Sequence, residues 1–266
     1  MKKIIASLLA AVSVFGAALG MTSCFGEQKE TLIVYTEAGF APWEFTQAGS
    51  TKVIGVDMEI AQYIADKYNW ELKVINGSFD SIVAGIAEDN ALGIAGISYS
   101  EKRAENVEFS DFYWGDAYQA VVYKNDSNPT LVEGKFAASN FEGAKLVYQT
   151  GTTSQITVTE NEADWAISNK NSFSQVLAAL EDMKTSSVKE YLIVDSQVAA
   201  QLAANDSAVS YAAIEGLDAE QYGIVAKKGN TELIAKVNAA LAELLVEDES
   251  GSNQIEKWFV QYSAAE

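Results

Sequence analysis

One arginine follows an apolar stretch in the segment GISYSEKRAENVEFSDFYW, which covers residues 96–114. Arg103 comes shortly after Ser98 and Ser100, beyond an apolar run that ends at Ile97. A guanidinium donates two parallel hydrogen bonds to a carboxylate, a geometry that lysine does not reproduce. Because α/β sheets bind ligands beyond the carboxyl ends of their strands, Arg103 is a candidate carboxylate-binding residue. The alternative is a surface ion pair with a nearby glutamate.

Two further polar features follow predicted strands. Gly151, Thr152 and Thr153 lie in a turn at the start of a predicted helix, where free backbone N–H groups and the helix dipole favour an anion. Asp195 comes directly after the apolar residues 191–194, so it could hold a cation or only cap the next helix. Thr153 could likewise only cap its helix. Two anion-binding features and one cation-binding feature suit a zwitterionic amino acid.

The strength of such a site follows from its hydrogen bonds. Each charge-assisted hydrogen bond contributes roughly 1.5–3 kcal/mol net. Three or four such bonds, after the entropic cost of ordering the ligand is subtracted, would give a binding free energy of about −8 kcal/mol. This value corresponds to a micromolar dissociation constant.

The composition excludes several other kinds of site. The chain has no histidine and a single cysteine, Cys24. Histidine general bases are therefore excluded, and beyond Cys24 so are cysteine nucleophiles and structural zinc sites. No calcium-loop spacing is present, so we expect no metal and no cofactor. The formal net charge of −19 opposes binding to nucleic acid, and we expect no nucleic-acid partner.

The first residues have the features of a secretory signal peptide. Lys2 and Lys3 precede an apolar run from Ile4 to Leu19, and small residues follow. The apolar run is too short for a comfortable membrane span. We therefore expect residues 1–23 to be a signal peptide and the protein to be extracytoplasmic.

Cys24 stands at the end of this signal, where it resembles the lipobox cysteine of bacterial lipoproteins. In such proteins the cysteine is lipidated and becomes the new N-terminus. Met21 departs from the pattern, which prefers leucine, and the alternative is an ordinary signal with an incidental cysteine. At least two acyl chains would hold the protein firmly at the membrane. We expect residues 24–30 to be the lipidated cysteine and a short tether.

Strand-like and helical segments alternate along the rest of the chain, which favours an α/β fold. The expected strands are residues 32–35, 72–74, 92–97, 120–123, 145–148 and 191–194. Apolar residues at helical spacing predict helices that include residues 60–68, 79–86, 173–180, 233–244 and 255–259. Asp57 and Ser78 are the expected N-caps of the first two helices. The elements form two sets without a flexible linker, which indicates lobes joined by short direct crossings.

Six segments resemble the signatures of polar amino-acid-binding proteins of ATP-driven uptake systems, the solute-binding family 3 type. They are GFAPWEF, VIGVDMEIAQYIA, AGISYSEKRAENVEFSDFYW, QTGTTSQ, LIVDSQVAA and YGIVAKKGNTELIAKVNAALAEL. The resemblance covers residues 31–262. One such segment would be a weak signal, whereas all six in order are specific.

The resemblance implies a two-lobed, type II periplasmic-binding-protein-like fold with a ligand cleft between the lobes. Its two hinge crossings would lie near Gly115 and near Leu217. The expected boundaries are residues 31–115 plus 218–266 for lobe 1 and residues 116–217 for lobe 2. Arg103 would then belong to lobe 1, and Thr153 and Asp195 to lobe 2. A ligand held by both lobes favours the closed state, which drives hinge closure.

The resemblance also implies how the two ends of an amino acid are held. Arg103 would grip the α-carboxylate with help from the backbone at Ser98 and Thr153. Asp195 and the Ser98 hydroxyl would hold the ammonium group, together with the Gly96 carbonyl. No catalytic residue is implied.

Three further positions would face the ligand side chain. By the resemblance, Phe40 and Phe79 sandwich it, although aromatic residues at such positions are by default core residues. Trp43 is expected in the core. Glu37 occupies a position that reaches the far end of the side chain in binders of basic amino acids. Glu37 favours lysine or arginine as the ligand, while the aromatic sandwich tolerates many polar or aliphatic side chains.

The expected function is therefore that of the substrate-binding component of an ABC-type amino-acid uptake system. A monomer would close over a free amino acid and deliver it to a membrane permease with its ATPase. One alternative is an enzyme resembling cyclohexadienyl or prephenate dehydratases on the same fold, in which a carboxylate serves as general acid. Asp195 disfavours this, because it would repel a dicarboxylate substrate. Another alternative is the amino-acid-sensing domain of a signalling system.

Overall fold

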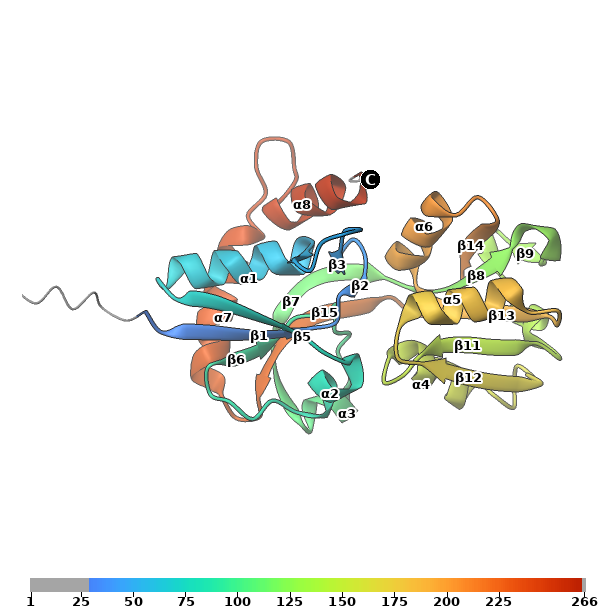
Figure 1. Cartoon of the computed structure of the whole chain (residues 1–266), viewed down its shortest axis with the longest axis horizontal. Helices are drawn as coiled ribbons and strands as arrows, with labels where there is room; N and C mark the ends of the chain where they lie inside the picture. Colours follow the sequence, from blue (N-terminus) through green and yellow to red (C-terminus); the bar gives the residue numbers. More distant parts are fainter. Residues whose placement is uncertain (1–28, 265–266) are drawn as a thin grey trace, which may run out of the picture.

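The computed structural model describes residues 29–264, which form two α/β lobes next to each other along the long axis of the molecule (Figure 1). Lobe 1 is built on the sheet that contains β1, and lobe 2 on the sheet that contains β11. Two long strands, β7 and β15, lead from one lobe to the other. The signal segment and Cys24 lie outside the described residues.

Lobe 1 contains eight of the described strands and five of the described helices. The strands are β1 (Thr31–Thr36), β2 (Gly39–Phe40), β3 (Glu44–Thr46), β4 (Val53–Ile54), β5 (Glu71–Asn76), β6 (Ala91–Gly93), β7 (Val107–Ala117) and β15 (Glu220–Lys227). The helices are α1 (Val56–Lys67), α2 (Phe79–Ala84), α3 (Glu101–Ala104), α7 (Thr231–Leu244) and α8 (Gln254–Ser263). The strand order β5-β1-β6-β15-β7 puts the amino-terminal strand at the centre of a parallel trio.

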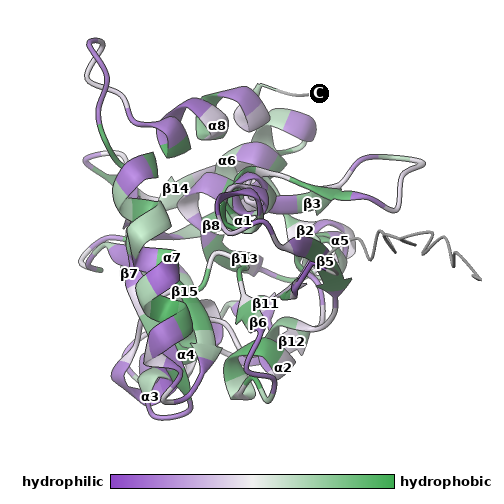
Figure 2. Cartoon of the chain, turned by 90° about the vertical axis from the view of Figure 1, so that its left-hand side faces the viewer, coloured by the Kyte–Doolittle hydropathy of each residue, from purple (hydrophilic) through white to green (hydrophobic). Residues whose placement is uncertain are grey.

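Both faces of this sheet are covered. Along β1, Leu32 and Val34 are buried in one apolar cluster, while Ile33 and Tyr35 pack against another on the opposite face. This alternation is the two-residue period of a strand. In Figure 2 strand and inner helix segments carry much of the green colour, and the outer loops are largely purple.

Lobe 2 repeats the same scheme. Its strands are β8 (Gln119–Lys124), β9 (Leu131–Val132), β10 (Lys135–Phe136), β11 (Lys145–Gln149), β12 (Asn169–Phe173), β13 (Glu190–Asp195) and β14 (Val209–Ala213). Its helices are α4 (Thr153–Glu160), α5 (Val176–Thr185) and α6 (Ser196–Asn205), with the 3-10 helices η1 (Asn125–Ser127) and η2 (Ala138–Phe141). The order β12-β11-β13-β8-β14 again combines a parallel trio with antiparallel strands. The expected two-lobed α/β fold is confirmed.

Some expected element boundaries are wrong. The N-cap of α1 is Gly55, whereas Asp57 lies inside the helix and is buried. Its carboxylate accepts hydrogen bonds from buried donors in place of the helix N-terminus. Helix α2 ends at Ala84, because Gly85 adopts a φ of 145° that a right-handed helix cannot continue. Phe173 ends β12, so it does not belong to α5.

The sequence patterns did not reveal the strands β7 and β15. Their segments mix charged, small and aromatic residues, so neither shows a clean apolar alternation. The pairing between them shifts register three times between Glu220 and Val225. Such irregularities increase local twist and bending, which suits strands that connect two lobes.

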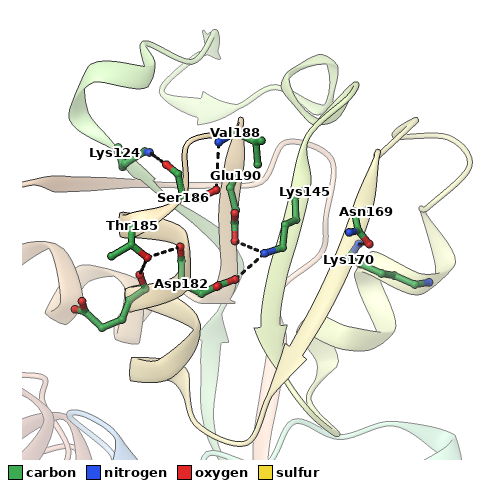
Figure 3. A network of polar contacts seen from close by, with 10 residues as sticks. Lys124, Lys145, Asn169, Lys170, Asp182, Thr185, Ser186, Val188 and Glu190 are labelled. Carbon is green, nitrogen blue, oxygen red and sulfur yellow. Dashed lines mark hydrogen bonds and ion pairs between the residues drawn. The ribbon is translucent and has the colours of Figure 1, made fainter.

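Lobe 2 also contains an ion-pair network around one buried carboxylate, that of Glu190 at the start of β13 (Figure 3). The Lys145 Nζ lies 2.7 Å from an Asp182 oxygen and 3.1 Å from a Glu190 oxygen. The Glu190 side chain is 0% exposed. A buried carboxylate requires such a partner because its desolvation is costly.

Candidate functional site

A narrow cavity lies between the two lobes. All eight residues expected to bind the ligand line it: Glu37, Phe40, Phe79, Gly96, Ser98, Arg103, Thr153 and Asp195. Four further residues also line it, of which only Thr152 belongs to a feature that the sequence singled out: Glu44, Ala95, Gln149 and Thr152. Many of these residues follow the carboxyl ends of strands, as expected for ligand sites of α/β sheets.

Arg103 reaches the cavity from the short helix α3. Ser100 is the N-cap of this helix, and its hydroxyl accepts a hydrogen bond from the Arg103 backbone N–H. The Arg103 side chain donates from Nη1 to the Ser98 carbonyl at 2.6 Å and from Nη2 to the Gly151 carbonyl at 2.9 Å. Gly151 belongs to lobe 2, so the second bond crosses the cleft. A guanidinium has five N–H donors, which leaves donors for a ligand carboxylate.

The surroundings of Arg103 fit a buried cation. The residue is 6% exposed, and its guanidinium carbon lies 5.3 Å from the centre of the Phe79 ring. This distance is within the range of a cation–π interaction. Burial lowers the pKa of Arg103, while the negative charges of Glu220 and Asp195 oppose that shift. A guanidinium remains charged in such a setting.

Asp195 ends strand β13 on the opposite side of the cavity. It occupies the N-cap position of α6, yet its side chain does not cap the helix. Instead, one oxygen accepts a hydrogen bond from Gln119 Nε2 at 2.7 Å, and the other accepts from the Tyr222 hydroxyl. Burial, and then the negative charge of Glu220, raise the pKa of Asp195 to about 7. The carboxylate retains lone pairs for an ammonium group.

Thr153 is not the cap of α4. The N-cap is Thr152, whose hydroxyl accepts from the Gln155 backbone N–H. Thr153 is the first helical residue, and its hydroxyl donates to a Glu220 oxygen at 2.8 Å. Its backbone N–H stands at the positive end of the helix dipole, where an anion is favoured.

Glu37 faces lobe 2 across the cavity. Its Oε2 accepts a hydrogen bond from Gln149 Nε2 at 2.9 Å. Burial raises the pKa of Glu37, and the bond from Gln149 partly offsets that effect. Phe40 and Phe79, both buried, supply aromatic walls, whereas Trp43 is fully enclosed in the core, as expected.

Glu44 is the acidic residue that the sequence reading missed. It is 1% exposed and lines the cavity, and its Oε2 has no hydrogen-bond partner among the described residues. Burial, and then the charge of Asp57, raise the pKa of Glu44 well above its usual range. The sequence signal was present, because Glu44 is the acid within GFAPWEF.

Asp57 does not line the cavity but binds the backbone of Gly96, which does. Its carboxylate accepts hydrogen bonds from the Gly96 backbone N–H at 2.8 Å and from the Tyr113 hydroxyl at 2.9 Å. Gly96 has a φ of 50°, and a Cβ there would come within 3.0 Å of the Phe40 ring. Asp57 therefore fixes the backbone at Gly96, where glycine keeps room for the aromatic wall.

The family model of bacterial extracellular solute-binding proteins, family 3, matches residues 32–261. The chain belongs to this family. Its relatives include the arginine-binding extracellular protein ArtP of Bacillus subtilis, 24% identical over 97% of this chain and 98% of that protein. They also include the L-cystine-binding protein TcyJ of Escherichia coli, 24% identical over 88% of this chain and 84% of that protein.

A solved structure of an ancestral arginine-binding protein bound to arginine has the same fold as this solute-binding protein. The TM-score is 0.75 at 28% identity, and the match covers 89% of this chain and 99% of that one. A second structure of an ancestral arginine-binding protein, bound to glutamine, matches with a TM-score of 0.74 at 29% identity.

Family membership establishes the general function. The protein is an extracytoplasmic substrate-binding component of an ABC-type amino-acid uptake system, and its partners are an amino acid and the transporter. The members are binding proteins, so the prediction that the chain is not an enzyme is confirmed and the dehydratase alternative is excluded. Between residues 29 and 264, no acidic or cysteine cluster suits a metal ion, and no helix has the length and apolarity of a membrane span.

Proposed function

We propose that this solute-binding protein captures a cationic amino acid, with L-arginine as the first candidate. The observation that carries this proposal is the excess of acids around the cavity. Glu37, Glu44 and Asp195 face a single cation, Arg103, among the described lining residues.

The charges of the lining residues do not cancel. Burial, and then the charge of Asp57, raise the pKa of Glu44 well above its usual range and so disfavour its charged form. With Glu37, Asp195 and Arg103 ionised, the cavity wall carries one net negative charge. A cationic amino acid has one net positive charge and neutralises it, whereas a neutral amino acid leaves a buried charge uncompensated. The relatives and neighbours described as arginine-binding support the same ligand class.

In the proposed complex, each charged group of the ligand has its own partner. The α-carboxylate binds Arg103 and the start of α4, and the ammonium group binds Asp195 with help from Ser98 and the Gly96 carbonyl. The side chain passes between Phe40 and Phe79. Its cationic end binds Glu37. Buried charged groups favour ligands that pair with all of them.

We propose the lobe boundaries given by the sequence, with hinge crossings near Gly115 and Leu217. We also propose that the protein acts as a monomer, anchored to the membrane by lipidation of Cys24. The cavity joins residues of one chain from both lobes, which supports a site complete within a single copy.

Calorimetry with L-arginine and L-citrulline tests the ligand class. Citrulline has nearly the shape of arginine but lacks its side-chain charge. We expect arginine to bind at least about a hundredfold more tightly, and Glu37→Gln to remove most of that preference. Equal affinity for the two ligands would refute a cationic ligand class while leaving amino-acid binding intact.

Fractionation of expressing cells tests the lipid anchor. The native protein should be recovered with membranes, and the Cys24→Ser variant in the soluble extracytoplasmic fraction. Membrane recovery of the variant would rule out anchoring through Cys24.

A further inference from the structure

Glu220 stands where the chain returns from lobe 2, as the first residue of β15. Its carboxylate is bonded on both sides to lobe 2. Oε1 accepts a hydrogen bond from Gln119 Nε2 at 2.9 Å, and Oε2 accepts from the Thr153 hydroxyl at 2.8 Å. Gln119 opens β8 and Thr153 opens α4, so one side chain on a connecting strand holds two elements of lobe 2.

The two bonds belong to a larger network beneath the cavity. Gln119 Nε2 also donates to Asp195 at 2.7 Å, and Gln119 Oε1 accepts from the Ser154 hydroxyl at 2.7 Å. Glu220 and Asp195 are therefore linked through one amide group. A partly buried network of this kind, in which each carboxylate oxygen of Glu220 has a donor, favours a single arrangement of the groups it joins.

Glu220 itself is not among the residues that line the cavity. Its hydrogen bonds can therefore affect a ligand only through other groups. Thr153 stands at the start of α4, two residues after Gly151, whose carbonyl accepts the cross-cleft bond from Arg103. We expect the Thr153–Glu220 bond to be lost when α4 moves away from lobe 1 as the cleft opens.

We propose that Glu220 is a positioning residue for ligand capture, whose carboxylate holds α4 and β8 in the closed arrangement and so sets the ligand affinity without touching the ligand. The apparent affinity of a two-state binding protein scales with the population of its binding-competent state. Bonds that exist only in the closed state raise that population. Glu220 and Thr153 therefore act as one latch.

A double-mutant cycle tests the latch with L-arginine as the probe. Glu220→Ala and Thr153→Val, which keeps the backbone of α4, should each weaken binding about tenfold, chiefly through faster dissociation. The double variant should be no weaker than Glu220→Ala, because both changes remove the same bond. Asp218→Ala is the matched control, since it removes an exposed acid from the same crossing and should leave affinity unchanged. Additive losses, or wild-type affinity in Glu220→Ala, would overturn the proposal.

A distance measurement tests closure without any ligand. Lys102 and Glu160 line the mouth of the cleft from opposite lobes, and both are exposed. Spin labels at Lys102→Cys and Glu160→Cys, in a Cys24→Ser background, report its opening by pulsed electron paramagnetic resonance. Glu220→Ala should enlarge the long-distance population of the ligand-free protein. An unchanged distribution would overturn the latch.

The distance measurement also distinguishes the role proposed for Glu220 from the proposed ligand class, on which the choice of L-arginine as the probe rests. If arginine fails to bind the parent protein, the proposed ligand class is wrong. The distance distributions still decide the role of Glu220, because they depend on closure alone. A merely structural role would lower the melting temperature without shifting the distances.

Discussion

Asp195 and Arg103 illustrate at the residue scale how the site holds opposite charges in one buried space. Asp195 is 4% exposed, and both residues already make hydrogen bonds to protein groups. Neither residue has used all its donors or acceptors. Each can therefore bind one end of a dipolar ligand without rearranging its own support.

The first residue-scale prediction concerns Arg103. Replacing Arg103 with alanine should weaken L-arginine binding by at least about a hundredfold, because a charged hydrogen-bonding partner of the carboxylate is lost. Calorimetry measures the affinity. Lys102→Ala is the control, since it removes an exposed cation from the same short helix and should change the affinity less than twofold. Retained affinity in Arg103→Ala would exclude it as the carboxylate partner.

The second residue-scale prediction concerns pH. The ligand ammonium requires an ionised Asp195, whose pKa is about 7. Affinity for L-arginine should therefore rise as the pH rises through about 7, by up to roughly tenfold per pH unit on the acidic side, and level off above it. Binding near neutral pH should release a proton, which calorimetry in buffers of different ionisation enthalpy detects. Asp195→Asn should bind weakly, without this dependence.

The stability of the ligand-free protein should respond in the opposite direction. The pKa of Asp195 is raised above its ordinary value of 3.8 by burial and by Glu220. Its contribution to stability is therefore present below about pH 4 and is lost as the pH rises through about 7. Thermal melts should show that Asp195→Asn removes part of this loss. Identical pH profiles for both proteins would contradict the raised pKa.

At the scale of elements, the network in Figure 3 joins β11, α5 and β13. Lys145 pairs with Asp182 and with the enclosed carboxylate of Glu190. The hydrogen bond from Lys145 lowers the pKa of Asp182. The Lys145–Glu190 ion pair holds the first residue of β13 in place. Because β13 ends in Asp195, this ion pair helps to position the strand that carries the site residue.

Replacing Lys145 removes the cation that pairs with Glu190. Lys145→Met leaves Glu190 buried without a partner and should lower the free energy of unfolding by about 3 kcal/mol or more. The double variant Lys145→Met with Glu190→Leu should recover much of that loss, because no unpaired charge remains. Denaturant unfolding measures both. A larger loss in the double variant would show that the ion pair itself stabilises lobe 2.

At the scale of the whole molecule, closure depends on how closely the lobes approach. Gly151 has a φ of 81°, and a Cβ there would lie 2.8 Å from Asp80 Cβ and 3.0 Å from Asp80 Cα. Asp80 belongs to α2 of lobe 1, so glycine allows the two lobes to meet at this point. A side chain at this position would keep them apart.

Alanine substitutions at two glycines test whether close approach of the lobes is needed for binding. Gly151→Ala should weaken L-arginine binding at least about tenfold, because the closed state is destabilised. Gly143→Ala is the control, since Gly143 has a φ of 69° and nothing within 4 Å of an added Cβ. Both variants impose similar backbone strain, and only the first should lose affinity. Calorimetry and melting temperatures, measured together, separate closure from folding.

Local pattern made much of the site predictable. Arg103, Asp195 and the turn around Thr153 were recognisable because they follow strand-like runs with the charge or free N–H groups that a ligand requires. The resemblance added Phe40, which lies within GFAPWEF, and also Phe79 and Glu37, which lie outside the six quoted segments. Asp57 was misread as a helix cap, because its partners, Gly96 and Tyr113, are distant in sequence.

The sequence by itself determined the α/β class, the likeness to a binding-protein family and the chemical groups that a ligand would meet. Tertiary structure alone decided which groups face each other across the cleft. The Gln149–Glu37 bond spans 112 positions and the Thr153–Glu220 bond spans 67. Side-chain periodicity records only neighbours along one helix or strand, whereas these bonds join residues that are far apart in the chain and meet only in the folded molecule. The hinge geometry therefore turned a set of local motifs into one enclosed site.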